Sequence, residues 1–254
     1  MTSAGFVGGG RVARILAGGW AHAGALPARI VVHEPSDAAF ERLRAVAPEA
    51  QRLPLEQAAA ADVVFLALHP PAIAPVLPQL RAALLPGATI VSLAPKVTIR
   101  ALVESAGTTR VARMIPNAPS LVGRGYNPVA FGPGIDADTK AGLATLFAPW
   151  GRAPEVPERD LEAYAILTGM GPTYFWYELQ ALRDLSREMG LSGTAADAGL
   201  RAMMEGAVAT LLDSGLQPSD VMDLVPVKPL AELEPVVMAA FHTALPALHS
   251  KIRP

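Results

Sequence analysis

The glycine-rich turn near the N-terminus is the first segment whose residue types and spacing could do chemistry. It joins an apolar run to a helix-forming stretch, and its residues are Gly8, Gly9, Gly10, Arg11, Val12 and Ala13. Gly8 lets the chain turn sharply out of a strand, and Gly10 lacks a Cβ, so the backbone can approach phosphates closely. Ala13 is small enough for the helix to pack on the strand, and the unpaired N–H groups at the helix start favour an anion. The turn predicts a pyrophosphate site for a dinucleotide, formed by residues 8–12.

A carboxylate, Glu34, stands at the end of the next predicted strand, at about the ~20-residue offset typical of a ribose-binding acid. It would accept hydrogen bonds from the adenosine ribose and repel a 2′-phosphate, which favours NAD. Ser36 and Arg11 could instead contact that phosphate, so NADP stays open. Glu34 could also be a solvated carboxylate in a turn. The expected cofactor is therefore NAD or NADP.

The composition limits the classes of protein to consider. With 254 residues, a net charge of −2 and 51% hydrophobic residues, the chain can bury a large core. It has no cysteine, which excludes disulfides, thiolate metal sites and cysteine nucleophiles and fits a reducing compartment. We find no basic run, no apolar stretch near the ~18 residues of a membrane span, and no export signal. We expect a cytoplasmic protein that binds no metal, nucleic acid or membrane.

Short β-rich runs alternate with helical stretches up to about residue 158. The six runs are apolar or β-branched and cover residues 3–7, 29–33, 63–68, 89–93, 111–115 and 129–131. Apolar strands separated by helices are typical of a parallel sheet covered on both faces. A late helix is predicted over 137–147, after Asp136. Residues 1–158 are therefore predicted to form a doubly wound α/β domain.

The strand signals end after about residue 159, and apolar residues recur at helical spacing instead. Three helices are predicted, over about 172–190, from about 196 to 215, and after 235. Gly199 and Gly206 weaken the second helix by about 1 kcal/mol each relative to alanine, so we expect them to permit close helix approach. The apolar stripes are too wide for residues 159–254 to cover alone, which predicts an all-α domain that forms a homodimer.

Four segments together resemble the pyrroline-5-carboxylate reductase family in order and approximate spacing. They are the turn at 8–13, DVVFLALHP at 62–70, RMIPNAPSLVG at 113–123 and TGMGPTY at 168–174. The last two are far more specific than the glycine turn. The resemblance implies a Rossmann domain, a helical dimerisation domain, and hydride transfer from NAD(P)H to the C=N bond of a cyclic imino acid, as in proline biosynthesis.

The resemblance also implies further contacts with the cofactor, from Leu68, His69, Pro70, Ala94 and Asn117. His69 and Pro70 follow a strand, at the edge where ligands bind in open α/β sheets. His69 could equally be an ordinary loop residue. The amide of Asn117 could orient the nicotinamide carboxamide or the substrate, or form an Asx turn that caps its loop.

The expected catalytic residues are Thr168, Tyr174 and Lys228. Thr168 keeps one of the two hydroxyls of the family's Ser-Gly-Ser-Gly-Pro motif, whereas Met170 replaces the other. Residues 225–230 replace the family's Ser-Pro-Gly-Gly-Thr-Thr turn, where Lys228 could bind a substrate carboxylate or simply face water. Tyr174 could contact the substrate or belong to a helix core. Little acid catalysis is needed, because an iminium already carries its proton near neutral pH.

Two other interpretations fit part of the sequence. The β-hydroxyacid dehydrogenases depend on a lysine early in their helical domain, but the four lysines here lie outside the two long predicted helices: Lys96, Lys140, Lys228 and Lys251. Lys96 stands where the family tends to have glycine. It could be a cation beside the nicotinamide or the acidic substrate, or an exposed loop residue. The other alternative is a non-catalytic NAD(P)-binding sensor or interaction protein derived from this family.

Overall fold

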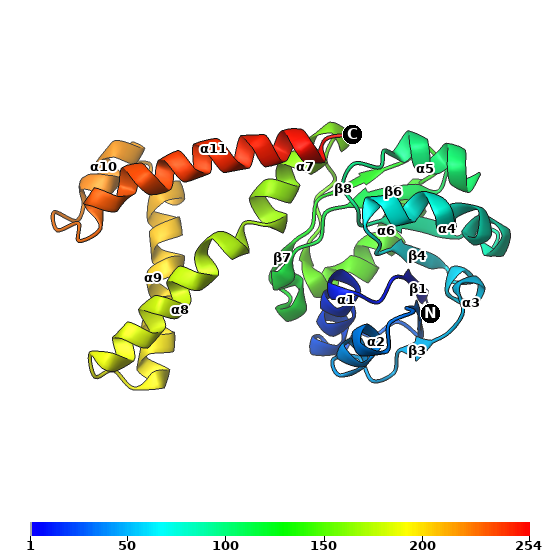
Figure 1. The fold of residues 1–254 in the computed structure, drawn as a ribbon, viewed down its shortest axis with the longest axis horizontal. Coiled ribbons are helices and arrows are strands. Elements are labelled where there is room, and N and C mark those ends of the chain that lie inside the picture. The colour runs from blue at the N-terminus through cyan, green and yellow to red at the C-terminus, as the bar shows by residue number, and fades with distance from the viewer. Residues whose placement is uncertain (1) are drawn as a thin grey trace. The chain divides into compact units, whose positions relative to one another are not determined.

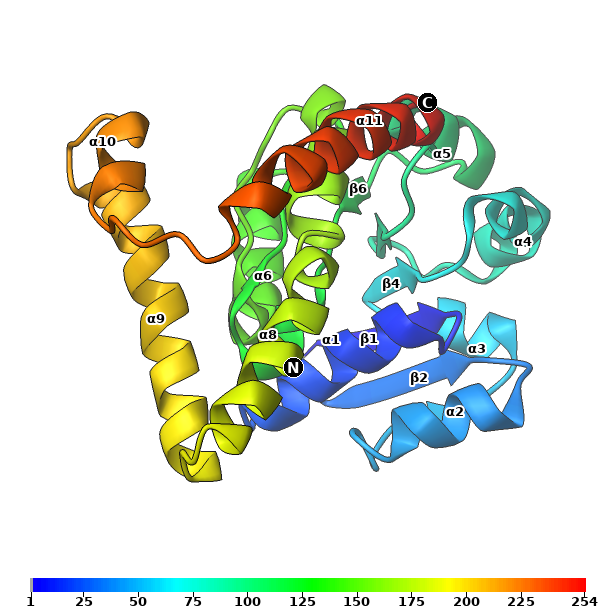
Figure 2. The same cartoon turned by 60° about the vertical axis from the view of Figure 1, so that its left-hand side comes forward.

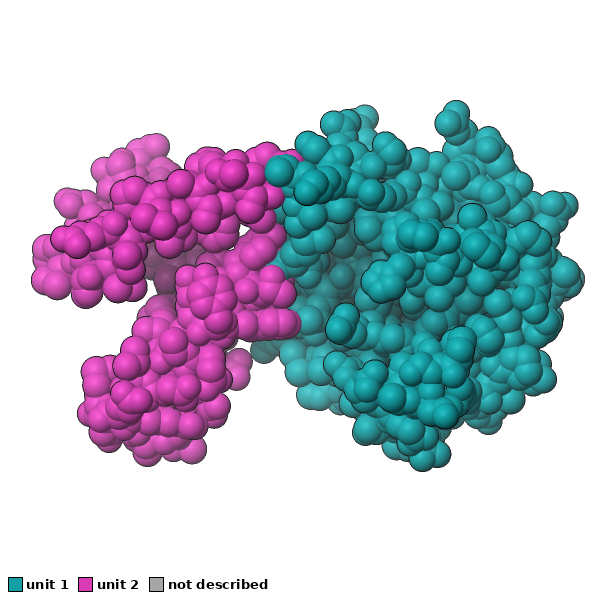
Figure 3. Space-filling view, in the orientation of Figure 1, with its two compact units in different colours: residues 1–170, 247–254 teal, residues 171–246 magenta. Residues whose placement is uncertain are grey.

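The computed structural model describes residues 2–254 and contains two compact units. The first unit comprises residues 1–170 and 247–254, and the second comprises residues 171–246. Figure 1 labels the elements along the chain, and Figure 3 colours the first unit teal and the second magenta.

The first unit is built on a seven-stranded sheet with the order β3-β2-β1-β4-β5-β6-β8. Its strands are β1 (Ser3–Val7), β2 (Arg29–His33), β3 (Gln51–Arg52), β4 (Val63–Leu66), β5 (Thr89–Ser92), β6 (Val111–Met114) and β8 (Val129–Phe131). β1 lies between β2 and β4, with Val7 opposite both His33 and Leu66. The strand order therefore reverses between β1 and β4, the switch point where open α/β sheets bind dinucleotides.

The expectation of an all-parallel sheet is wrong at one edge, because β8 runs antiparallel to β6. A parallel strand needs a crossover of a dozen or more residues, usually a helix. Residues 115–128 are long enough for a crossover but form no α-helix: they hold the short helix η1 (Ala118–Val122) and the two-residue strand β7 (Gly125–Tyr126). Three predicted strands also end earlier than expected, at Leu66, Ser92 and Met114.

Helices cover both faces of the sheet, as expected for a doubly wound fold (Figure 2). They are α1 (Arg11–His22), α2 (Asp37–Arg44), α3 (Leu55–Ala59), α4 (Pro70–Ala83), α5 (Ile99–Ala106) and α6 (Ala137–Phe147). One apolar cluster contains side chains of α1, α2 and α6, and another contains side chains of α3, α4 and α5. Asp136 caps α6 by accepting a hydrogen bond from the backbone of Thr139 at 2.8 Å.

An aromatic core holds α1 against the end of α6. Trp20 lies in the same cluster as Phe65 and Trp150, with ring centroids 5.9 and 4.7 Å from its own. The Trp20 indole donates to the carbonyl of Leu146 at 2.8 Å, and the Trp150 indole donates to the carbonyl of Leu16 at 2.8 Å. Trp150 ends η2 (Ala148–Trp150), which leads into β9 (Gly151–Arg152), the parallel partner of β7.

The compact first unit extends beyond the predicted boundary at residues 158/159. It includes η3 (Glu158–Asp160), α7 (Leu161–Tyr164) and the π-helix η4 (Ala165–Gly169). Leu161 and Ala165 share a buried apolar cluster with Ile99, Ile115 and Ile252. Because of this packing, the first residues of the predicted helical domain belong to the first compact unit. The boundary between the two compact units lies between residues 170 and 171.

The second unit is helical, as expected. Its elements are α8 (Pro172–Glu188), α9 (Gly193–Asp213), α10 (Pro218–Asp223), η5 (Ala231–Leu233) and most of α11 (Glu234–Ile252). Arg183 of α8 pairs with Asp197 of α9. Within residues 2–254, no atom outside the neighbouring residues and backbone of α9 lies within 4 Å of a Cβ built at Gly199 or Gly206, so the expected close helix approach is not made within this chain. In the same range, no helix is both long and apolar enough to span a membrane.

Candidate dinucleotide site

The glycine turn has the geometry that its sequence predicts. Gly8 has φ +100°, and a Cβ there would lie 2.6 Å from the carbonyl oxygen of Ala67. A Cβ on Gly9 would lie 2.8 Å from the Cβ of Glu34. Gly10 differs, because no described atom lies within 4 Å of a Cβ built on it. Gly8 and Gly9 are therefore needed by the fold, whereas Gly10 leaves open space at the start of α1, as a pyrophosphate site requires.

Glu34 lies beside the glycine turn, at the residue that follows the end of β2. Its Oε2 accepts a hydrogen bond from the backbone N–H of Gly9 at 2.8 Å, and its Oε1 accepts one from the N–H of Ser36 at 2.8 Å. The carboxylate is thus fixed against the glycine turn and is not simply a solvated turn residue. This is the position from which an acid binds ribose hydroxyls in dinucleotide sites.

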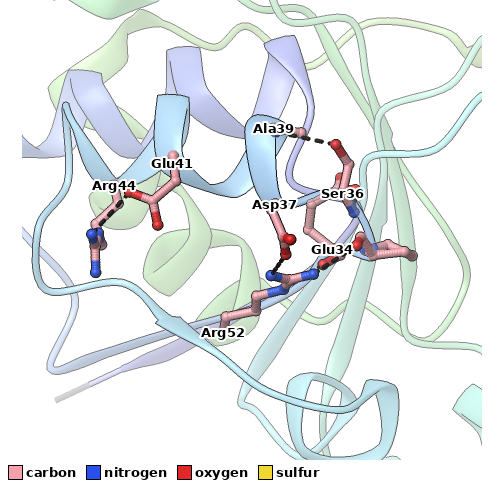
Figure 4. Close-up of polar contacts among 8 residues, drawn as sticks. Glu34, Ser36, Asp37, Ala39, Glu41, Arg44 and Arg52 are labelled. Atoms are coloured by element: carbon pink, nitrogen blue, oxygen red, sulfur yellow. Dashed lines mark hydrogen bonds and ion pairs between the residues drawn. The ribbon is translucent and has the colours of Figure 1, made fainter.

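Arg52, which the sequence analysis missed, orders the loop that follows Glu34 (Figure 4). Its guanidinium donates to the carbonyls of Glu34 at 2.7 Å and Pro35 at 2.6 Å, and it forms an ion pair with Asp37. The Ser36 hydroxyl accepts a hydrogen bond from an N–H in the first turn of α2. The charge of Arg52 is thus neutralised by Asp37. The sequence carries no signal for Arg52, because β3 is a two-residue exposed strand without a hydrophobic pattern.

The other predicted cofactor residues lie at the same carboxyl edge of the sheet. The Cδ2 of Leu68 would lie 3.0 Å from a Cβ on Gly8, and Leu68 packs against the apolar cluster that contains Ala94. His69 is exposed and precedes α4, whose first residue is Pro70. Arg11 is exposed as the first residue of α1, and Val12, which follows, is half-buried. Contact of each residue with a cofactor stays a prediction.

The amide of Asn117 is engaged within its own loop. Its Oδ1 accepts from the N–H of Tyr126 at 3.2 Å, and its Nδ2 donates to the carbonyl of Thr168 at 3.1 Å. Its backbone N–H donates to Oδ1 of Asn127 at 3.1 Å. These bonds support the loop-capping alternative and link the loop to η4. A direct contact between Asn117 and the nicotinamide stays a prediction that these bonds do not require.

The three predicted catalytic residues are divided between the two units. Thr168 lies in the π-helix η4, where its hydroxyl donates to the carbonyl of Tyr164 at 3.0 Å. Tyr174 lies in α8, with its ring 5.7 Å from that of Phe241, and burial raises the pKa of its hydroxyl. Lys228 is exposed, between α10 and η5. π-Bulges are frequent at functional sites, which favours Thr168. The catalytic roles of all three residues stay predictions.

The fold and the glycine turn define a class of protein, the dinucleotide-dependent oxidoreductases with a Rossmann-type domain. The family model described as "NADP oxidoreductase coenzyme F420-dependent" matches residues 3–96. The model described as "Pyrroline-5-carboxylate reductase dimerisation" matches residues 158–228. The second match begins where the sequence predicted the helical domain.

Whole-chain comparisons identify the family. A pyrroline-5-carboxylate reductase from Corynebacterium melassecola is 31% identical over 87% of this chain and 84% of its own length. The Escherichia coli enzyme of that name is 26% identical over 87% of this chain and 83% of its own length. The chain belongs to the pyrroline-5-carboxylate reductase family. It is therefore an NAD(P)-dependent reductase, as expected, and these relatives give no support to the non-catalytic alternative.

Solved structures share the fold over nearly the whole chain. The pyrroline carboxylate reductase of Plasmodium falciparum, determined with NADP bound, has a TM-score of 0.78 at 22% identity and covers 98% of this chain and 97% of its own. The Coxiella burnetii pyrroline-5-carboxylate reductase has a TM-score of 0.68 at 25% identity over 99% of this chain and 94% of its own. The predicted architecture, a doubly wound domain followed by a helical domain, is confirmed.

Proposed function

We propose that the protein transfers a hydride from NADH or NADPH to the C=N bond of a cyclic imino acid of the pyrroline-5-carboxylate type. The observation that carries this proposal is the open space at Gly10 beside a carboxylate bonded to Gly9, in a chain of this family. The residues present fit a dinucleotide, because a Cβ at Gly10 would fill part of the space that its phosphates need.

Most of the predicted cofactor residues have a task in this proposal. The N–H groups of Gly10, Arg11 and Val12 bind the pyrophosphate, because those of Gly8 and Gly9 already donate to His33 and Glu34. Glu34 binds the adenosine ribose. Leu68, His69, Pro70 and Ala94 border the nicotinamide half. When bound, the reduced dinucleotide supplies the hydride.

Three residues have roles in binding the substrate. Thr168 and Tyr174 contact it through their hydroxyls, and Lys228 binds its carboxylate. An iminium enters already protonated, so these side chains mainly orient the C=N carbon and exclude water.

We further propose that NADH is preferred. The Glu34 carboxylate would repel a 2′-phosphate, and the guanidinium of Arg52, which bonds the carbonyl of Glu34, is already paired with Asp37. The exposed Arg11 and the Ser36 hydroxyl are the groups that favour NADPH. The Glu34 carboxylate is a negative charge held in place by the N–H of Gly9, whereas Arg11 is exposed to solvent. We therefore assign NADH as the preferred cofactor.

The second unit is proposed to bind a second copy of the chain. Large apolar side chains on α8 and α9 are exposed, among them Trp176, Leu185 and Val208. Gly199 and Gly206 would then meet the partner instead of a helix of their own chain. A cytoplasmic location remains a prediction that rests on the cysteine-free composition.

The test is a screen of NADH and NADPH oxidation against pyrroline-5-carboxylate and a panel of other cyclic imines. Steady oxidation with a carboxylated imine, and a loss of apparent substrate affinity on Lys228→Met, would support the proposal. Tight dinucleotide binding with no turnover across the panel would instead favour a non-catalytic protein. Turnover only with imines that lack a carboxylate would contradict the role of Lys228.

A further inference from the structure

A buried charge cluster lies beneath the loop that follows β5, entirely within the first unit. We define the Arg113 cluster as Arg113 of β6, Glu158 of η3 and Glu162 of α7. Arg113 donates to Glu158 at 2.9 Å and to Glu162 at 2.5 Å. The side chains of Arg113 and Glu162 are 1% and 3% exposed. Charges removed from water to this degree are expensive unless they are paired and hydrogen-bonded.

The two carboxylates of the Arg113 cluster also hold the backbone of the loop. The Oε1 of Glu162 accepts from the N–H of Lys96 at 3.3 Å, and the Oε1 of Glu158 accepts from the N–H of Ile99 at 2.6 Å. Ile99 is the first residue of α5, where a negative charge is favourable. The cluster therefore fixes both ends of residues 96–99.

Lys96 is the residue in this loop that needs such support. Of the non-glycine residues that the structure describes, it has the one positive φ, 73°. A left-handed backbone costs a residue with a Cβ about 1–2 kcal/mol. Its side chain is exposed, so packing of the side chain does not hold the conformation. The bond from its N–H to Glu162 is the contact that offsets this penalty.

We infer that the Arg113 cluster is a positioning device for the nicotinamide half of the cofactor site. It holds Lys96 left-handed and thereby sets the path of residues 94–99 at the carboxyl end of β5. This inference rests on the proposed function, because that edge borders the nicotinamide only if the dinucleotide lies across the β1/β4 switch point. Glu162 acts through the loop and is a positioning residue.

The test compares dinucleotide affinity in four proteins, measured by NADH fluorescence: wild type, Glu162→Ala, Lys96→Gly and the double variant. Glu162→Ala should weaken NADH binding about tenfold, which corresponds to ~1.4 kcal/mol. The double variant should return to within about threefold of wild type, because glycine adopts a positive φ without penalty. The matched control is Glu155→Ala, which removes an exposed ion pair with Lys140 and should not change the affinity.

A second readout does not need the cofactor. Amide hydrogen exchange around residue 96 should accelerate in the dinucleotide-free Glu162→Ala protein. If that variant does not fold, Lys96→Pro carries the test, since proline has no N–H and cannot adopt a positive φ. Lys96→Pro should weaken NADH binding by the same factor of about ten.

The outcomes separate the two proposals. Unchanged affinity in Glu162→Ala, or an affinity loss that Lys96→Gly does not rescue, overturns the positioning role. If wild type binds neither NADH nor NADPH, the proposed function fails first and the positioning role falls with it.

Discussion

Replacing Gly8 and Gly10 by alanine, one at a time, should separate what the turn does for folding from what it does for binding. At Gly8 the backbone has φ +100°, and a Cβ would lie 2.6 Å from the carbonyl oxygen of Ala67. The positive φ alone costs alanine about 1–2 kcal/mol, and relieving the close contact adds to this. We therefore expect Gly8→Ala to lose at least about 2 kcal/mol of unfolding free energy, or ~4–8 °C in Tm.

Gly10 presents the opposite case. Its φ of −71° suits any residue, and no described atom lies within 4 Å of a Cβ built there. The loss of glycine at the helix N-cap and the lower entropy of the unfolded chain nearly offset each other, so stability should stay within about 1 kcal/mol of wild type. The methyl group occupies space that the phosphates need. NADH affinity should fall at least about tenfold, or ~1.4 kcal/mol.

Two assays check this pair of predictions. Calorimetry of the dinucleotide-free proteins gives Tm, and NADH fluorescence titration gives Kd. If Gly10→Ala binds NADH as wild type does, the pyrophosphate does not lie at this turn. If Gly8→Ala melts with wild type, the argument from its backbone conformation is wrong.

Three other substitutions test other parts of the structure. Glu34→Gln should raise the affinity for NADPH relative to NADH at least about tenfold, because the charge that repels a 2′-phosphate is removed; competitive titrations of both nucleotides measure the ratio. Asp62→Asn should destabilise the protein near neutral pH, because bonds from the backbone N–H and hydroxyl of Ser3 hold the pKa of this carboxyl below its usual range. That contribution is present above about pH 4 and is lost as the pH falls through the lowered pKa, so urea melts of variant and wild type should converge in acid. Val208→Glu, on an exposed part of α9, should shift sedimentation from dimer towards monomer, and an unchanged dimer would place the interface elsewhere.

The sheet was predictable from the sequence where burial on both faces leaves a continuous apolar run. β1, β2 and β8 have the predicted bounds for that reason. β3 was not predicted, because two exposed residues give no hydrophobic period. The antiparallel direction of β8 was also missed, since a run of three apolar residues carries no information on direction.

The same contrast applies to the candidate site. The geometry of the Gly8–Gly10 turn and the place of Glu34 beside it were predictable, because a dinucleotide-binding motif constrains residue type and spacing locally. Their contact with a dinucleotide stays a prediction. The ion pairs of Arg113 were not, because both partners lie more than forty positions away in the chain, at separations of 45 and 49. The sequence could not decide whether the amide of Asn117 bonds to its own loop or to a ligand, because an amide can donate and accept hydrogen bonds in either setting.

The reciprocal tryptophan bonds bear on how the chain is made. Trp20 finds its acceptor 126 positions later, at Leu146, and Trp150 finds its acceptor 134 positions earlier, at Leu16. During synthesis at about 5–20 residues per second, the indole of Trp20 in α1 therefore lacks its native acceptor for many seconds. A nascent chain that stops before Trp150 carries the whole glycine turn but lacks the segment that seals it. The packing of α1 beside the glycine turn is therefore complete only after residue 150 has been synthesised.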